Sequence, residues 1–144
     1  AVFCAASVGV SVVMEKANPN YSTKSFAEAL KARLSGTNAQ VFIYDHPGAF
    51  YDFEFYLGHP VKLVGLEGEL ELTKGDEEER EASVTHEKFK EMLNGSDSIY
   101  CLMRKSDYLG LDPNDRKRVR ILTEDKRKVL IANPAALSQR GGSL

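Results

Sequence analysis

The chain has 144 residues, of which 42% are hydrophobic and 28% charged, a balance typical of one globular domain. Its 19 basic and 21 acidic side chains leave a net charge of −2, which provides no overall field to attract nucleic acid. Two cysteines, Cys4 and Cys101, are too few for a disulfide framework, and we expect two unpaired thiols. The composition therefore argues against nucleic-acid-binding, disordered and disulfide-scaffold proteins.

The first fourteen residues, AVFCAASVGVSVVM, contain no charged side chain, and polarity begins abruptly at Glu15 and Lys16. A helix needs about 20 apolar residues to cross a bilayer, so this run alone is too short. One interpretation is that the run is the last part of a truncated transmembrane span. Its valines also alternate with small residues, as in a native strand that packs on the domain, and both interpretations stay open. A signal peptide is disfavoured because no basic region precedes the run.

The next segment predicts a helix, a strand and a second helix. The first helix is expected before Gly36, since Ser25 and Glu28 fit a capping box and apolar residues recur after them at helical spacing. The uninterrupted apolar run VFIY at residues 41–44 predicts a strand that is covered on both faces in a parallel sheet. Residues 49–57 carry aromatic side chains at helical spacing, which predicts a short helix.

A second strand, a charged loop and a third helix are predicted in the middle of the chain. Residues 61–66 predict the strand, and the strict alternation of residues 69–72 suggests an exposed edge or a further strand. Residues 74–82, KGDEEEREA, are too charged to be buried and predict a solvated loop. The helix is expected to be capped by Thr85 and to end at Asn94.

The C-terminal third predicts a buried strand, one turn of helix and a hairpin. The strand covers residues 99–103. The helical turn, residues 107–111, is expected to be capped by Ser106 and closed by Pro113. Apolar residues alternate on both sides of the charged residues 124–127, which predicts a terminal hairpin.

This order of elements predicts an α/β fold, with a mostly parallel sheet of about three central strands flanked by helices and a C-terminal hairpin. We expect three parts. Residues 1–17 form the end of a truncated span or an apolar segment, residues 18–134 a soluble α/β domain that Pro134 ends, and residues 135–144 a loose tail.

Common catalytic and cofactor motifs are absent from the sequence. Neither GxxxxGK[ST] nor GxGxxG occurs, so the glycine loops that wrap phosphates are missing. The three histidines, His46, His59 and His86, lack a cysteine or carboxylate at ligand spacing, which argues against a metal site. Cys101 lies in an apolar strand and is expected to be an inert buried thiol. We therefore expect no cofactor, no metal and no catalytic residue in this chain.

One group of polar residues lies where the predicted strands end. In open α/β sheets ligands bind beyond the carboxyl ends of the strands, and a small polar or anionic ligand fits this group. The same residues can instead cap turns or stay solvated, which remains open. A hydrolase that uses Asp45 with His46 is disfavoured, because neighbours on a strand point to opposite faces. The candidate ligand-binding residues are Tyr44, Asp45, His46, Arg104, Lys105, Asp107 and Tyr108.

A second group is basic and lies in and just before the predicted hairpin. Each such charge can contribute about 1 kcal/mol near an anionic membrane surface, which would suit a domain that rests on a bilayer. Charged edge strands also prevent sheets from aggregating, and both roles remain open. The candidate membrane-surface residues are Arg116, Lys117, Arg118, Arg120, Lys126, Arg127 and Lys128.

Five segments between Ala1 and Pro134 carry a resemblance to a known family. They are YSTKSFAEAL (21–30), VFIYD (41–45), AFYDFEFYLGHPV (49–61), SIYCLMRKSDY (98–108) and RKVLIANP (127–134). In order and spacing they resemble the C-terminal soluble domain of integral-membrane glycosyltransferases, of the aminoarabinose transferase and dolichyl-phosphate-mannose protein mannosyltransferase type. The phrase FYLGHPV is the most distinctive, and none of the five is a catalytic signature.

The resemblance implies a non-catalytic extracytoplasmic domain of a parent that moves a sugar from a polyprenyl-phosphate donor to a lipid or protein acceptor. In that family a separate multi-span domain holds the catalytic residues, so this fragment alone is expected to be inactive. The implied partners are the transmembrane domain of the parent chain and membrane lipid or lipid-linked sugar. The parent is expected in the bacterial inner membrane, with this domain on the periplasmic or extracellular side. The alternative is a stand-alone α/β module that binds a small polar or anionic ligand at the strand ends.

Overall fold

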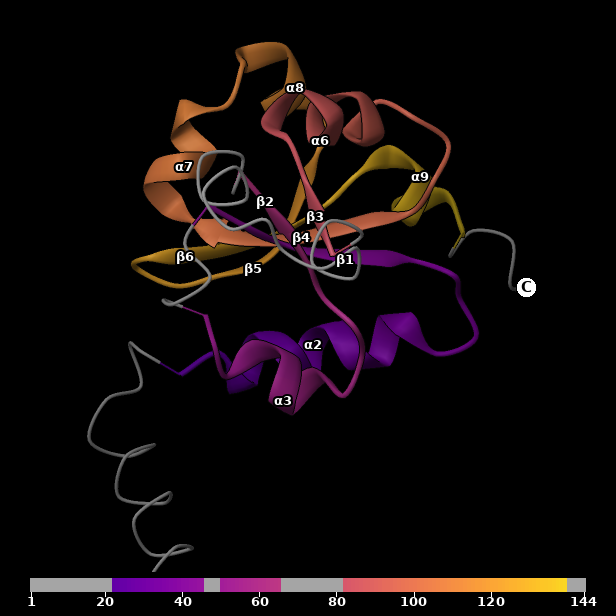
Figure 1. Cartoon of the computed structure of the whole chain (residues 1–144), viewed down its shortest axis with the longest axis vertical. Coiled ribbons are helices and arrows are strands. Elements are labelled where there is room, and N and C mark those ends of the chain that lie inside the picture. Colours follow the sequence, from indigo (N-terminus) through magenta and orange to yellow (C-terminus); the bar gives the residue numbers. More distant parts are fainter. Residues whose placement is uncertain (1–21, 46–49, 66–81, 140–144) are drawn as a thin grey trace, which may run out of the picture.

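The computed structural model describes residues 22–45, 50–65 and 82–139. These residues form one six-stranded sheet with helices on both of its faces (Figure 1). In chain order the elements are α2 (Lys24–Leu34), β1 (Gln40–Tyr44), α3 (Phe53–Leu57), β2 (Lys62–Val64), β3 (Ser83–Val84), α6 (His86–Leu93), β4 (Ile99–Arg104), α7 (Lys105–Gly110), α8 (Pro113–Arg118), β5 (Arg120–Glu124), β6 (Lys128–Ala132) and α9 (Pro134–Ser138).

The sheet is mixed, with the strand order β3-β2-β1-β4-β6-β5. The three predicted strands β1, β2 and β4 are parallel, and β3 extends them at one edge. At the other edge β6 pairs with β4 in antiparallel fashion and β5 pairs with β6. The predicted hairpin is confirmed, but the expected sheet of about three mostly parallel strands is wrong. All five residues of β6 are buried, so the hairpin is an integral part of the sheet.

The core has two layers, one on each face of the sheet. Side chains that alternate along a strand point to opposite faces, so β1, β4 and β6 each contribute to both layers. One layer packs β1, β4 and β6 against α2 and α3, with Phe26, Leu30, Val41, Phe53, Leu102 and Leu130 among its residues. The other layer packs the same strands against α6, with Phe42, Phe89, Cys101, Met103 and Ile131 among its residues. As expected, Cys101 is fully buried.

Two prolines that were expected to end elements begin helices. Proline is well accommodated at the first helical position, where the missing N–H has no partner in any case. Pro113 begins α8 after Asp112, whose side chain accepts a hydrogen bond from Asn114 N. Pro134 begins α9, so the chain stays folded through Ser138 rather than becoming loose after residue 134.

Asn133 ties α9 to the centre of the sheet. Its fully buried side-chain oxygen accepts hydrogen bonds from Ile99 N and Ala136 N, both at 3.0 Å, and its amide nitrogen donates to Asp97 O at 2.8 Å. One side chain thus caps α9 and satisfies backbone groups where β4 begins. No short-range pattern in the sequence marks Asn133, because its partners at residues 97 and 99 are more than thirty positions away.

Helix caps agree with the sequence in part. Thr85 caps α6 as predicted, accepting a hydrogen bond from Lys88 N at 3.1 Å. Ser106 lies inside α7, which begins one residue after Arg104, so its predicted capping role is wrong. Likewise α2 has Thr23 as its N-cap, and Ser25 lies within the first turn.

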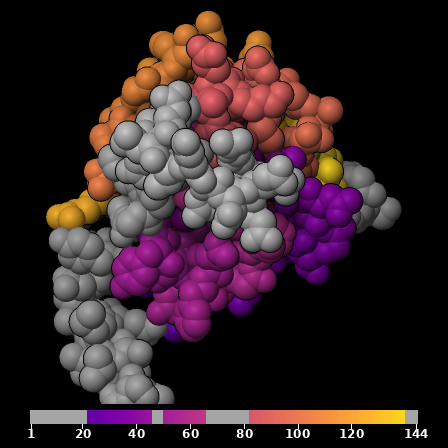
Figure 2. All heavy atoms as spheres, viewed as in Figure 1, coloured from indigo at the N-terminus to yellow at the C-terminus, as the bar shows by residue number. Residues whose placement is uncertain are grey.

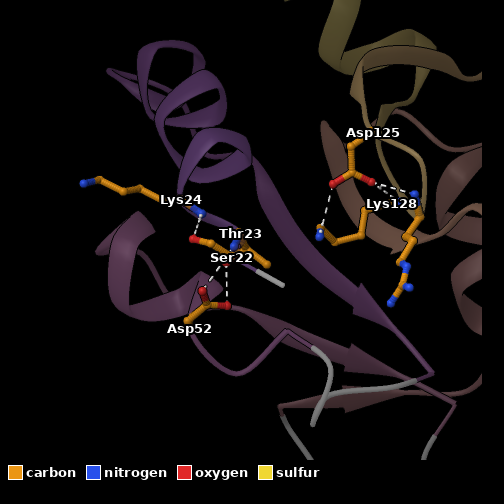
Figure 3. Close-up of polar contacts among 7 residues, drawn as sticks. Ser22, Thr23, Lys24, Asp52, Asp125 and Lys128 are labelled. Atoms are coloured by element: carbon orange, nitrogen blue, oxygen red, sulfur yellow. Dashed lines mark hydrogen bonds and ion pairs between the residues drawn. The ribbon is translucent and has the colours of Figure 1, made fainter. Parts of the chain in front are cut away.

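Thr23 does not cap α2 through its own side chain but connects α2 to α3. Its backbone N–H donates to Asp52 Oδ2 at 3.1 Å and its hydroxyl donates to Asp52 Oδ1 at 2.7 Å, as Figure 3 shows. Thr23 is fully buried, and Asp52 is the N-cap of α3. A carboxylate that accepts two hydrogen bonds is a strong link, because charge-assisted bonds are about twice as strong as neutral ones. We call this pair the Thr23–Asp52 clamp.

The hairpin turn is organised by Asp125. Its carboxylate accepts hydrogen bonds from Arg127 N and Lys128 N, both at 2.7 Å, and lies 3.1 Å from Lys128 Nζ. Burial by itself raises the pKa of Asp125, but the two backbone donors and the Lys128 ammonium outweigh it and lower the pKa below 3.8. Lys128 is itself buried, and its ammonium lies 5.7 Å from the centre of the Phe26 ring in α2.

Several expectations lie outside the described residues. These are the apolar residues 1–17, the alternating residues 69–72, nearly all of the charged segment 74–82, and His46. In the three described ranges, none of the helices combines the length and the apolar character required to cross a bilayer.

Replacing Thr23 by valine is expected to lower the free energy of unfolding by about 1.5 kcal/mol, because it removes a charge-assisted hydrogen bond at a fully buried position. Thr37→Val is the matched control, since the Thr37 hydroxyl donates only to the neutral carbonyl of Leu34 at a half-buried position. We expect the control to cost less than about 0.5 kcal/mol in the same urea titration. Equal losses in the two variants would show that the clamp adds no stability of its own.

Asp125→Asn is expected to destabilise the protein at neutral pH. The folded state lowers the pKa of Asp125, so the ionised carboxylate adds stability above pH 3.8, and this gain is lost as the pH falls through the folded value. The difference in unfolding free energy between wild type and variant should therefore shrink between pH 5 and about pH 2. Chemical denaturation at a series of pH values checks this, and a difference that does not change with pH would contradict it.

Candidate functional site

Asp45 lies directly after β1, at the carboxyl edge of the parallel strands. Its backbone N–H donates to Val64 O at 2.9 Å, which continues the pairing of β1 with β2. Its φ of 59° is in the left-handed region, which aspartate tolerates better than most residues because its short polar side chain can bond locally. This conformation turns the chain away from the sheet at the position where the sequence predicted a ligand contact.

The Asp45 carboxylate is paired with His86, the first residue of α6. Asp45 Oδ1 and His86 Nε2 are 2.5 Å apart, although the residues are 41 positions apart in the chain. Both side chains are partly exposed, and the His86 ring also meets Tyr44 edge to face, with centroids 5.3 Å apart. Helix α6 directly follows β3, and β3, β2 and β1 are parallel. The first residue of α6 therefore lies at the carboxyl edge of the sheet, where β1 also ends.

Gly65 leaves room for this pair. It has a φ of +89°, and a Cβ at this position would lie 2.0 Å from Asp45 Oδ1 and 2.6 Å from His86 Nε2. A side chain at this position would therefore strain the backbone and displace the Asp45–His86 pair. The ends of β1 and β2 and the start of α6 meet at this point.

A pocket of about 200 Å³ opens beside the His86 ring. Tyr44, His86 and Phe89 line one part of it, and the Tyr44 and Phe89 rings are 5.7 Å apart. The lining also includes Leu111 and Asp112 from the α7–α8 connection. We call this the strand-end pocket.

Asp115 adds a carboxylate to the lining of the strand-end pocket. Asp115 is almost fully buried, accepts a hydrogen bond from Asn94 Nδ2 at 3.2 Å and lies 3.7 Å from Lys90 Nζ. Arg118 Nη1 in turn donates to Asn94 Oδ1. With Glu87 and Asp112 also in the lining, the acidic side chains outnumber Lys90, so the pocket is better suited to a neutral or cationic polar ligand than to an anion.

The structure brings together some of the predicted ligand residues and separates others. Tyr44 and Tyr108 pack on the same core layer, on the α6 side of the sheet. Asp45 and Asp107 both act on the Cys101 thiol: burial raises its pKa most, and the negative charges of Asp107 and Asp45 raise it further. This thiol therefore stays protonated, as expected for an inert core residue.

The two basic residues of the predicted group lie elsewhere. Lys105 Nζ is 3.1 Å from Glu124 Oε2, so it pairs with the hairpin. Arg104 is exposed, and since Met103 faces the α6 layer, strand alternation directs Arg104 to the α2 and α3 side. His86 was not among the predicted ligand residues. The predicted Thr85 cap contained the signal, because a helix that starts after a parallel strand places its first residue at the carboxyl edge.

The predicted basic group is divided between two ends of the sheet. Arg116, Lys117 and Arg118 lie on α8, which leads to the start of β5. The turn residues Lys126 and Arg127 lie at the other end of that strand. Arg120 belongs to the α8 end, because it is in register with Ala132. Lys128 is buried against Asp125 and Phe26, so it is not a surface residue, and its membrane-surface assignment is corrected.

Among the described residues, no three histidine, cysteine, aspartate or glutamate side chains gather to hold a metal ion. The chemistry that the geometry supports is polar binding: an imidazole held by a carboxylate, in a pocket lined by aromatic and acidic side chains.

Comparison with known proteins points to one family. The profile of the family described as "Aminoarabinose transferase C-terminal domain" matches residues 27–133. No curated protein matches the chain. Two solved structures of ArnT from Cupriavidus metallidurans share its fold. The apo structure aligns with a TM-score of 0.63 and 23% identity over 81% of this chain, and the structure bound to undecaprenyl phosphate with 0.67 and 21% over 86%.

The chain spans about a fifth of the length of these two structures, 21% and 22%. Of the two related types in the sequence resemblance, the comparisons support the aminoarabinose transferase type, and none of them supports the mannosyltransferase type.

Gly65→Ala is expected to cost about 3 kcal/mol or more of unfolding free energy, because the new Cβ would overlap the Asp45–His86 pair and the backbone φ is strained for alanine. Gly36→Ala is the matched control, with a φ of +73° and nothing within 4 Å of its Cβ. It should cost only about 1 kcal/mol, the price of the conformation alone. Urea denaturation of both variants checks this, and similar losses would mean that the Asp45–His86 pair does not need the space at Gly65.

Proposed function

The chain belongs to the family of aminoarabinose transferase C-terminal domains, and from this membership we propose that it is the extracytoplasmic, non-catalytic domain of a membrane glycosyltransferase. The parent protein moves a sugar from a polyprenyl-phosphate donor to a lipid or protein acceptor. The observation that carries this proposal is the family match over residues 27–133, because it covers both core layers and the whole sheet.

Two further observations support the proposal. The solved structures that share this fold are about five times longer than the region they share with this chain, which leaves room for a separate catalytic part in such proteins. One of them is described as bound to undecaprenyl phosphate, a polyprenyl phosphate. For the parent of this chain we accordingly propose a lipid-linked sugar donor, with aminoarabinose as the first sugar to test.

The internal contacts of the domain support an accessory role. Its most reactive type of side chain, the Cys101 thiol, is buried and has a raised pKa. The Asp45 carboxylate is directed at His86 against the Gly65 backbone, an arrangement that joins three elements of the fold. We propose that the parent lies in the bacterial inner membrane and that this domain rests on its periplasmic or extracellular side, in contact with the parent's own transmembrane domain.

The strand-end pocket favours a second candidate function. In this alternative the domain is a stand-alone module that binds a small polar ligand between Tyr44, His86 and Asp115. The acidic lining favours a neutral or amino-bearing ligand over the anionic one that the sequence also allowed.

A transfer assay tests the proposed function. Incubated with undecaprenyl-phosphate-linked aminoarabinose and bacterial envelope lipids and proteins as acceptors, the 144-residue chain is expected to yield no transferred sugar. The ArnT protein from Cupriavidus metallidurans serves as a positive control for donor and assay. Measurable transfer by the chain alone would contradict the accessory role.

An NMR titration with free aminoarabinose distinguishes the stand-alone binding module from the accessory domain. Shifts confined to Tyr44, His86 and neighbours of Asp115 would favour the stand-alone binding module, and their loss in Asp115→Asn would locate the ligand. We expect no saturable shifts if the domain acts only as part of its parent.

A further inference from the structure

Two large aromatic side chains are exposed at the start of α3: Phe55 lies in the helix, and Tyr51 lies just before its N-cap Asp52. Tyr51 is 81% exposed and Phe55 is 83% exposed, four residues further along. In the same segment Phe53 and Leu57 are buried in the core, whereas Phe55 is exposed next to the exposed carboxylate of Glu54. In Figure 2 α3, in magenta, stands at the surface of the molecule beside α2, in indigo. Exposed aromatic side chains that gather on one surface are a feature of interaction sites.

The fold places this aromatic pair next to the point where the chain enters the described structure. The Thr23–Asp52 clamp holds the start of α3 against the start of α2, and Tyr51 directly precedes Asp52. The apolar run at residues 1–14 ends only eight positions before Ser22, a reach of at most about 29 Å. Whatever surface holds that run is therefore within reach of Tyr51 and Phe55.

Basic side chains lie on the same edge. The Lys128 ammonium contacts the Phe26 ring in the first turn of α2, so the hairpin turn lies near the start of that helix. Figure 1 shows the β5–β6 turn and the starts of α2 and α3 at the same side of the molecule. The turn exposes Lys126 and Arg127. Aromatic residues flanked by lysine and arginine are the combination that membrane–water interfaces favour.

We propose that this edge, formed by Tyr51, Phe55, Lys126 and Arg127, docks on the surface of a lipid bilayer, with the two rings inserted at the level of the lipid headgroups. The inference rests on the proposed function and on the interpretation of residues 1–14 as the end of a membrane span. The sequence assigned seven basic residues to a membrane surface. The docking proposal keeps Lys126 and Arg127 in the turn, whereas the basic residues of α8 lie on a different side of the domain.

The sequence contains no tryptophan, so single substitutions report on individual positions. The test variant is Phe55→Trp, and the matched control is Leu109→Trp. Among the residues that the structure describes, Leu109 is the third exposed large apolar one, at 59%, and it lies on α7, whose Tyr108 packs on the α6 side of the sheet. Both positions are exposed, so neither substitution should disturb folding.

Each variant of the full chain is mixed with vesicles of phosphatidylcholine and phosphatidylglycerol whose acyl chains are brominated close to the headgroups. We expect both variants to sediment with the vesicles. The emission of Phe55→Trp should shift to the blue and be largely quenched by bromine, whereas Leu109→Trp should keep its emission. Removing both aromatic side chains, in Tyr51→Ser/Phe55→Ser, should weaken vesicle binding by about tenfold or more.

The other outcomes separate this inference from the function on which it rests. If both variants sediment but Phe55→Trp is not quenched, the edge does not touch lipid and the docking proposal is overturned, while membrane attachment stands. A blue shift without quenching also overturns it, because the ring is then covered by protein and not by lipid. If neither variant sediments with vesicles, both the docking proposal and the membrane attachment fail.

Discussion

The Thr23–Asp52 clamp is the contact from which the orientation of this domain follows. One carboxylate accepts both the backbone and the hydroxyl hydrogen bond of a fully buried threonine, and so fixes where α2 begins relative to α3. Because α2 and α3 share one core layer, the same contact determines which side of α3 is buried and which remains outside. The entry of the chain, the exposed aromatic residues and the basic turn thereby come to one edge of the molecule.

The carboxyl edge of the sheet carries two different surfaces on its two sides. On the α6 side, Asp45, His86 and Gly65 close the strand ends beside the strand-end pocket. On the α2 and α3 side, the edge is aromatic and basic. In the proposed role as an accessory domain of a membrane glycosyltransferase, this division would let one surface rest on lipid while the pocket on the other side stays open to polar molecules.

Much of the fold followed from short-range patterns. Apolar runs predicted β1, β2 and β4, the Thr85 cap predicted α6, and alternation predicted the hairpin, because each signal lies within about ten residues. What escaped prediction depends on distant partners. Strand β3 has only two residues, too few for a sequence pattern. Lys128 was predicted as a surface charge, because its contacts with Asp125 and Phe26 appear only in the folded structure. At the site, Tyr44 and Asp45 were found by their position after β1, whereas the partner of Asp45, His86, lies 41 residues away.

The most direct measurement is a structure of the parent protein in a lipid nanodisc, determined by electron cryo-microscopy with the bilayer density resolved. We expect the Thr23–Asp52 clamp to be intact, Tyr51 and Phe55 to lie at the headgroup level, and the strand-end pocket to face away from the lipid. A domain seated on the bilayer through α6 or α8, with α3 in solvent, would contradict the orientation derived from the clamp.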